Sequence, residues 1–193
     1  SIDRSARESA LQASAKPLHG FKLQDLNGNQ RLNIVSLNLA GASMAKNDPA
    51  DFCSDILALM ARLQAQVMCI QDYNLVKDSW ADKTICSLLG RVGLTMCRSI
   101  RKTQHSRLSS SRSQSMGVAI IAPSALTVKP SILSDETCMW IAVDIQIDPS
   151  NSARIFSIYS PPGAKNSTLR KTINEATASH MEAADKYVIV ASD

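Results

Sequence analysis

The sequence predicts a mixed α/β fold in which two β-sheets pack together and are flanked by helices. Strand-like and helix-like segments alternate in the first half of the 193 residues, whereas several strand-like segments follow one another in the second half. Strands clustered in this way do not fit a simple alternating parallel sheet. A content of 45% hydrophobic and 20% charged residues is ordinary for a globular domain that buries a core.

The first 30 residues are polar and weakly patterned, and they contain Pro17, Gly20 and the turn-forming Asn27-Gly28-Asn29. We expect residues 1–30 to form an extension that wraps the domain or binds a partner. The domain itself is predicted to cover residues 31–193, because no repeat or shift in composition marks a second domain.

The first half of the domain is predicted to contain two strands and two helices. Residues 32–39 have strand composition. Asp48 and Pro49 provide an N-cap and a first-turn proline for a helix. Residues 67–70 form a short apolar strand, and residues 79–92 form a second helix. The apolar side of this second helix is predicted to contain Trp80, Ile85, Leu88, Leu89 and Val92.

The second half is predicted to contain several strands and one helix. The expected strands are residues 117–122, 140–147, 154–159 and 187–191. We expect Trp140, at the start of a strand, to lie in the core. The helix begins near Asn166 or Ser167, and its apolar stripe contains Leu169, Ile173, Ala176 and His180.

Basic residues are concentrated in one segment of a chain that carries a net charge of +4 and has a pI near 8.9. This segment has no acidic residue, and its basic side chains are Arg98, Arg101, Lys102, Arg107 and Arg112. We predict a long loop or mobile hairpin at residues 101–115. The basic side chains are candidates to bind nucleic-acid phosphates. The alternative is a solvated loop, since no aromatic residue lies among them to stack on bases.

The five cysteines form no C-x-x-C pair, so neither a zinc knuckle nor a disulfide framework is indicated. We expect them to be small buried hydrophobic residues in a reducing compartment. No apolar stretch reaches the length of a membrane span, and the N-terminus lacks the apolar region of a signal peptide. These features predict an intracellular protein without a membrane segment.

Polar residues interrupt the apolar strands at their ends. They are Asn38, Asp72, Tyr159 and Asp193, at the ends of IVSLN, VMCIQD, IFSIY and VIVASD. Residues just past strand ends converge on one rim in open-sheet folds. Carboxylate and amide oxygens at such a rim suit Mg²⁺, which also binds water and substrate phosphate. For any single residue, the alternative is a polar side chain that caps a turn.

The ordered motifs S-L-N-L, I-Q-D, G-V-A-I-I, I-Y-S-P and V-I-V-A-S-D resemble those of the endonuclease/exonuclease/phosphatase superfamily. The match covers about residues 32–193 and looks most like the endonuclease domain of LINE-type retrotransposons. Abasic-site nucleases, sphingomyelinases, inositol-phosphate phosphatases and deadenylases share these motifs. The resemblance implies a four-layer α/β sandwich that hydrolyses phosphodiesters.

The resemblance also implies a role for each strand-end residue. Asp72 corresponds to the metal-binding Glu, and Asn38 to the Asn that helps to hold metal and phosphate. Tyr159 corresponds to the Tyr that contacts the scissile phosphate, and Asp193 to the Asp that orients the attacking water or phosphate. The implied cofactor is Mg²⁺ or Mn²⁺, held by Asp72 and Asn38.

The sequence departs from the family pattern at three places. Asp72 is one methylene shorter than Glu, and Ser192 replaces the usual Gly. The chain given ends at Asp193, without the following Asn and the Ser-Asp-His segment, so we expect a C-terminally incomplete sandwich with an open sheet edge. Other protein chains are candidates to cover this edge. The histidines present, His19, His105 and His180, are not expected to supply the catalytic His.

Three functions are compatible with these observations. The first is a Mg²⁺-dependent DNA endonuclease of retrotransposon type, which would act in the nucleus. The second is a catalytically inactive nuclease-like fold that serves as a structural or nucleic-acid-binding subunit, with RNA or DNA as its ligand. The third is a phosphatase or phospholipase of the same superfamily, against which the basic segment argues.

Overall fold

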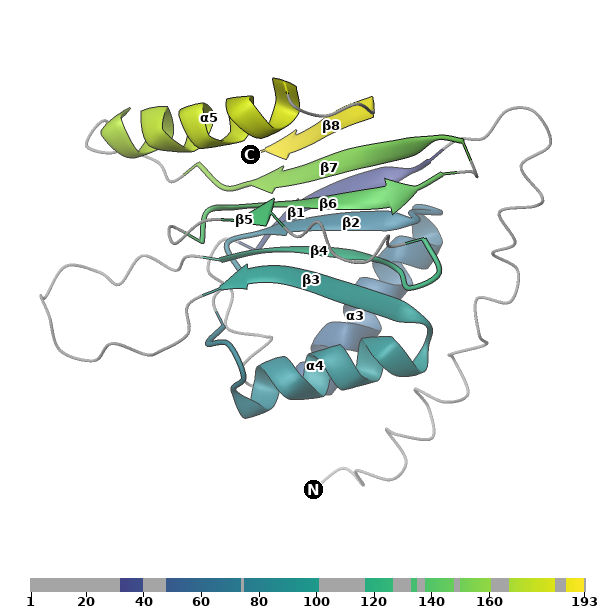
Figure 1. Cartoon of the computed structure of the whole chain (residues 1–193). Helices are drawn as coiled ribbons and strands as arrows, with labels where there is room; N and C mark the ends of the chain where they lie inside the picture. The colour runs from purple at the N-terminus through teal and green to yellow at the C-terminus, as the bar shows by residue number, and fades with distance from the viewer. Residues whose placement is uncertain are drawn as a thin grey trace, which may run out of the picture.

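A computed structural model describes residues 32–39, 48–73, 75–100, 117–126, 133–134, 138–147, 150–160, 167–182 and 187–192. This part of the chain forms two mixed four-stranded sheets that lie between helices. Figure 1 shows α5 on the outer side of one sheet and α3 and α4 on the outer side of the other. The predicted α/β architecture, two packed sheets flanked by helices, is therefore confirmed.

The first sheet has the strand order β1-β2-β4-β3. Its strands are β1 (Ile34–Asn38), β2 (Val67–Gln71), β3 (Leu94–Ile100) and β4 (Gly117–Pro123). β1 and β2 are parallel, with Asn38 opposite Gln71, while β4 pairs antiparallel with both β2 and β3.

The second sheet has the strand order β5-β6-β7-β8. Its strands are β5 (Leu133–Ser134), β6 (Trp140–Gln146), β7 (Ser152–Ile158) and β8 (Tyr187–Ser192). β7 and β8 are parallel, with Ile158 opposite Ser192, and the other two pairs are antiparallel.

Two of the described helices begin with a capping side chain, and for the first of them it is the predicted Asp48. The Asp48 side chain accepts hydrogen bonds from the amides of Ala50 and Asp51 and so caps α3 (Pro49–Arg62). Ser79 caps α4 (Trp80–Arg91) by accepting from the amide of Asp82. These contacts satisfy amide groups that have no partner within the helix. The third described helix is α5 (Ser167–Glu182). None of the described helices is long and apolar enough to span a bilayer.

The structure differs from the prediction at β3 and at Trp80 of α4. β3 was not among the predicted strands, because the basic Arg98 interrupts its apolar pattern. Trp80 does not lie on the apolar side of α4, since 61% of its surface is exposed. It occupies the first position of the helix, and the buried face is instead formed by Ala81, Ile85 and Leu89, at a spacing of four residues.

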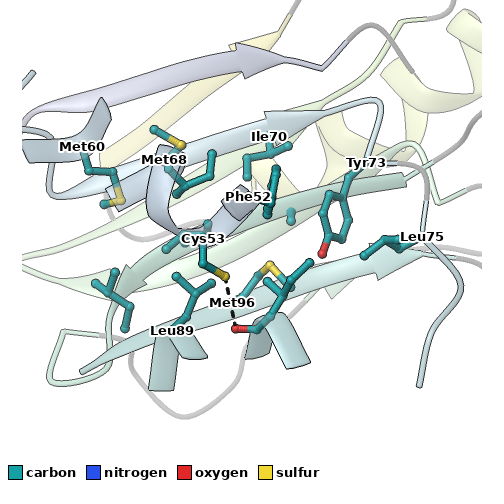
Figure 2. Packing of buried hydrophobic residues seen from close by; sticks show 14 of the residues in the cluster. Phe52, Cys53, Met60, Met68, Ile70, Tyr73, Leu75, Leu89 and Met96 are labelled. Atoms are coloured by element: carbon teal, nitrogen blue, oxygen red, sulfur yellow. Dashed lines mark hydrogen bonds between the residues drawn. The ribbon is translucent and has the colours of Figure 1, made fainter. Parts of the chain in front are cut away.

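Three apolar clusters fill the spaces between the layers. The first, between α3, α4 and the first sheet, includes Phe52 and Tyr73, whose ring centroids are 6.1 Å apart (Figure 2). The second lies between the two sheets. In the third, below α5, Trp140 stacks on Phe156 and contacts the ring of His180, which confirms the core position expected for Trp140. Four of the five cysteines are buried, as predicted, whereas Cys86 is half-buried.

Candidate functional site

The carboxyl ends of four strands lie at one rim of the sandwich. β1 and β2 end together, because Asn38 is opposite Gln71. β7 and β8 end together, because Ile158 is opposite Ser192. The two pairs are joined across the sheets, where Gln71 Nε2 donates to Ser157 Oγ at 3.3 Å. The strand ends that the sequence marked as polar are therefore neighbours in space.

Strand alternation places Asn38 and Gln71 on the side of the first sheet that faces the second sheet. Ile34, on the same face of β1 as Asn38, belongs to the cluster between the sheets. Cys69, on the same face of β2 as Gln71, belongs to it as well. Tyr159 follows β7 and packs in the same cluster with 8% of its surface exposed. Its amide donates to the carbonyl of Met139 at 2.8 Å, which fixes the backbone just past the strand end.

Asp72 leaves the strand in a left-handed conformation. Its φ is +56°, and 5% of its surface is exposed. Asp is among the residues that adopt this conformation at modest cost. The next residue, Tyr73, returns to the sheet by donating its amide to the carbonyl of Gly117 at 2.8 Å. Asp72 is thus held between two hydrogen-bonded residues, Gln71 and Tyr73.

A buried polar network adjoins this rim and was not chosen from the sequence. The Ser36 hydroxyl lies 2.9 Å from Gln71 Nε2 and 3.1 Å from Gln71 Oε1. The Ser157 hydroxyl accepts from Gln71 and donates to the carbonyl of Ile70 at 3.3 Å. The signal that could have identified Gln71 is a large amide in an otherwise apolar strand, VMCIQ, that is buried along its whole length.

A groove of about 420 Å³ opens beside the rim, between α5 and the ends of β7 and β8. Tyr159, Ser160 and Ser192 line its rim side. The α5 side contributes the polar residues Arg170, Asn174 and Thr177. The groove therefore brings hydrogen-bonding groups next to the strand ends.

The donor set at the rim fits a hard divalent cation only in part. Within the described ranges, no three His, Cys, Asp or Glu side chains lie close enough together to hold a metal ion by themselves. Asn38 and Asp72 offer one amide and one carboxylate oxygen donor, which is the kind of sparse set that Mg²⁺ supplements with water and substrate phosphate. Asp193 lies outside the described residues.

Arg98 requires a correction, because it lies in β3 and not in a loop. Its guanidinium forms an ion pair with the fully buried Asp82 of α4, with Nε 2.6 Å from Oδ1 and Nη2 donating to Oδ2 at 2.8 Å. Burial lowers the pKa of Arg98, but the hydrogen bond with Asp82 and the electrostatic interactions with nearby acidic groups together outweigh this, so the pKa is raised overall. The sequence could not show that a helix residue neutralises this charge.

The other predicted phosphate-binding residues lie outside the described part of the chain; they are Arg101, Lys102, Arg107 and Arg112. His19 and His105 lie outside it as well. His180 lies on α5 and packs against Trp140 of β6, with ring centroids 5.5 Å apart. This contact agrees with the packed role expected for His180.

Comparison with known proteins identifies the fold. No protein-family profile and no curated protein sequence matches the chain. Among solved structures, an AP endonuclease (LMAP) from Leishmania major matches with a TM-score of 0.57 and 16% identity over 89% of this chain and 57% of its own. TDP2 from D. rerio, complexed with a single-strand DNA product, matches with a TM-score of 0.54 and 13% identity over 84% of this chain and 60% of its own.

A third structure is an endonuclease/exonuclease/phosphatase family protein from Leptotrichia buccalis C-1013-b. It matches with a TM-score of 0.51 and 15% identity, over 84% of this chain and 66% of its own. The chain thus has the endonuclease/exonuclease/phosphatase fold, as its motifs predicted, and spans less than two thirds of the length of each of these proteins.

Proposed function

We propose that the chain is a nuclease-type phosphodiesterase domain, covering residues 31–193, that acts on nucleic acid with a divalent cation. The observation that carries this proposal is the meeting of four strand ends at one rim, with Asn38, Asp72 and Tyr159 beside it. The fold is shared with an AP endonuclease and with a protein crystallised with a DNA product. Nicking of DNA by a retrotransposon-type enzyme in the nucleus is the finer form of the proposal, and its support is the sequence motifs.

In this proposal, Asp72 and Asn38 hold Mg²⁺ or Mn²⁺ through oxygen atoms. The bound cation would supply positive charge that neutralises the phosphate oxygens and the leaving group. The Tyr159 hydroxyl donates a hydrogen bond to an oxygen of the scissile phosphate, and Asp193 orients the attacking water or the phosphate. The chain's own contribution is therefore to orient the phosphate and the water before reaction.

Arg101, Lys102, Arg107 and Arg112 are proposed to contact phosphates away from the cleaved bond. Each cation that neutralises a phosphate releases counterions, so affinity for DNA or RNA should fall steeply as salt rises. Arg98 is left out of this set because Asp82 already pairs with it.

Nicking of supercoiled plasmid tests the proposal. Cleavage should require Mg²⁺ or Mn²⁺, stop with EDTA, and fall by about a hundredfold in Asp72→Asn. Asp55→Asn is the matched control, because Asp55 is an exposed carboxylate on α3 and should leave cleavage unchanged. Equal cleavage by both variants would exclude Asp72 from the site.

A second candidate function is a nucleic-acid-binding or structural subunit without catalysis. It is favoured by β8, which ends the second sheet in the described part of the chain and exposes large apolar side chains. These are Tyr187 at 66%, Val188 at 37% and Val190 at 47% exposure. A strand from a partner protein could pair with such an edge. Salt-dependent binding of RNA or DNA without cleavage would support this function over the first.

A further inference from the structure

We propose that Gln71 is a positioning residue for the rim: its amide sets the two sheets in the relative position that brings Asn38, Asp72 and Tyr159 together, and thereby sets the affinity for the cation. This inference rests on the proposed function. Gln71 is fully buried, and its side chain contacts one residue in its own sheet and one in the opposite sheet.

Each contact of Gln71 is made next to a proposed site residue. Ser36 lies two residues before Asn38 on the same face of β1, and Ser157 lies two residues before Tyr159 on β7. The Gln71 carbonyl accepts from the amide of Leu39 at 3.1 Å, just past Asn38. Gln71 itself precedes Asp72 directly. A shift of Gln71 would therefore move three strand ends at once.

The apolar layer between the two sheets indicates why an amide side chain occupies position 71. The neighbouring positions on the inner faces, Cys69 on β2 and Ile155 on β7, are apolar and buried. Apolar contacts are not directional, so they tolerate small displacements of one sheet over the other. Hydrogen bonds from a buried amide have fixed directions and lengths, and an unpaired amide in this layer is costly. Gln71 thus selects one relative position of the sheets.

The test compares cation affinity with stability in three variants. Gln71→Met keeps the length of the side chain and removes the amide, Ser157→Ala removes the partner on β7, and Val67→Ala creates a defect in the same layer at the other end of β2. Mn²⁺ affinity is measured by electron paramagnetic resonance, and stability by urea unfolding. Gln71→Met should weaken Mn²⁺ binding about tenfold, as for other residues that support metal ligands.

Val67→Ala should lose stability while it keeps the affinity of the wild type. The double variant Gln71→Met with Ser157→Ala should bind Mn²⁺ no more weakly than Gln71→Met alone, because both changes break the same hydrogen bond between the two sheets. Wild-type affinity in Gln71→Met would overturn the positioning role.

If the wild type itself binds no Mn²⁺, the proposed function fails, and the positioning role is then decided without metal. Amide hydrogen exchange at Leu39 and Tyr159 should in that case accelerate about tenfold in Gln71→Met and stay unchanged in Val67→Ala. Unchanged exchange at both amides would overturn the inference.

Discussion

Gly117 and Tyr73 approach each other so closely that no side chain fits between them. A Cβ built on Gly117 would lie 2.3 Å from the carbonyl oxygen of Tyr73 and 2.9 Å from Cγ2 of Ile100. The same pair is joined by the hydrogen bond from the Tyr73 amide to the Gly117 carbonyl. Since Tyr73 follows Asp72, the close approach holds the turn that carries the proposed metal ligand.

Gly117→Ala is expected to destabilise the fold by about 1–3 kcal/mol, because the methyl group forces backbone atoms apart. Gly90→Ala is the matched control: Gly90 lies in α4, and nothing approaches its Cβ position within 4 Å. Alanine in a helix is favoured over glycine, so this control should be stabilising by about 0.5–1 kcal/mol. Urea unfolding measures the free energy of unfolding of both variants. A neutral Gly117→Ala would show that the strands separate without cost.

Tyr73→Phe is expected to stabilise the protein by about 1 kcal/mol. The Tyr73 hydroxyl is fully buried and has no hydrogen-bond partner among the described residues. Figure 2 shows its ring beside Phe52 in the cluster below the first sheet. Removing the hydroxyl removes the cost of its desolvation. Tyr187→Phe, at an exposed site, should change nothing. A lower thermal midpoint for Tyr73→Phe would mean that the hydroxyl is hydrogen-bonded.

Local patterns in the sequence were sufficient to predict most helices and strands and the residues at which the strands end. Asp48 and Pro49 mark the start of α3 because capping depends on neighbouring residues alone. Asn38 and Tyr159 stand out because polar residues end apolar strands, and the fold brings those ends together. The same reasoning missed β3, where one charged residue breaks the apolar pattern.

Contacts between distant residues could not be predicted. Gln71 and Ser157 are 86 residues apart, and their hydrogen bond exists only because β2 and β7 face each other. Asp82 and Arg98 meet across a helix and a strand. Neither pair has a local signature, so these buried polar contacts follow from topology, which periodicity does not specify.

Asp82→Ala is expected to destabilise the fold by about 3 kcal/mol, the lower end for a broken buried pair, because Arg98 loses its partner but its side chain is 20% exposed. The Asp78 amide, which donates to Asp82 at 2.8 Å, would lose an acceptor as well. The contrast is Glu175→Ala, which breaks the exposed pair with Lys171 on α5. That change should cost less than about 0.5 kcal/mol. Similar losses of stability in both variants would mean that water hydrates the Arg98 guanidinium when Asp82 is absent.

Stability is expected to fall above pH 9, in part through Cys69. Burial raises the pKa of the Cys69 thiol from 9.0 to about 12. Between these values the unfolded state releases the thiol proton while the folded state keeps it, so rising pH favours unfolding; below pH 9 both states are protonated and the thiol has no effect. At pH 10 the loss should be about 1.4 kcal/mol relative to pH 8. Cys69→Ala, unfolded in urea at both values, should show a pH dependence smaller by this amount. An unchanged dependence would mean that the thiol ionises equally in both states.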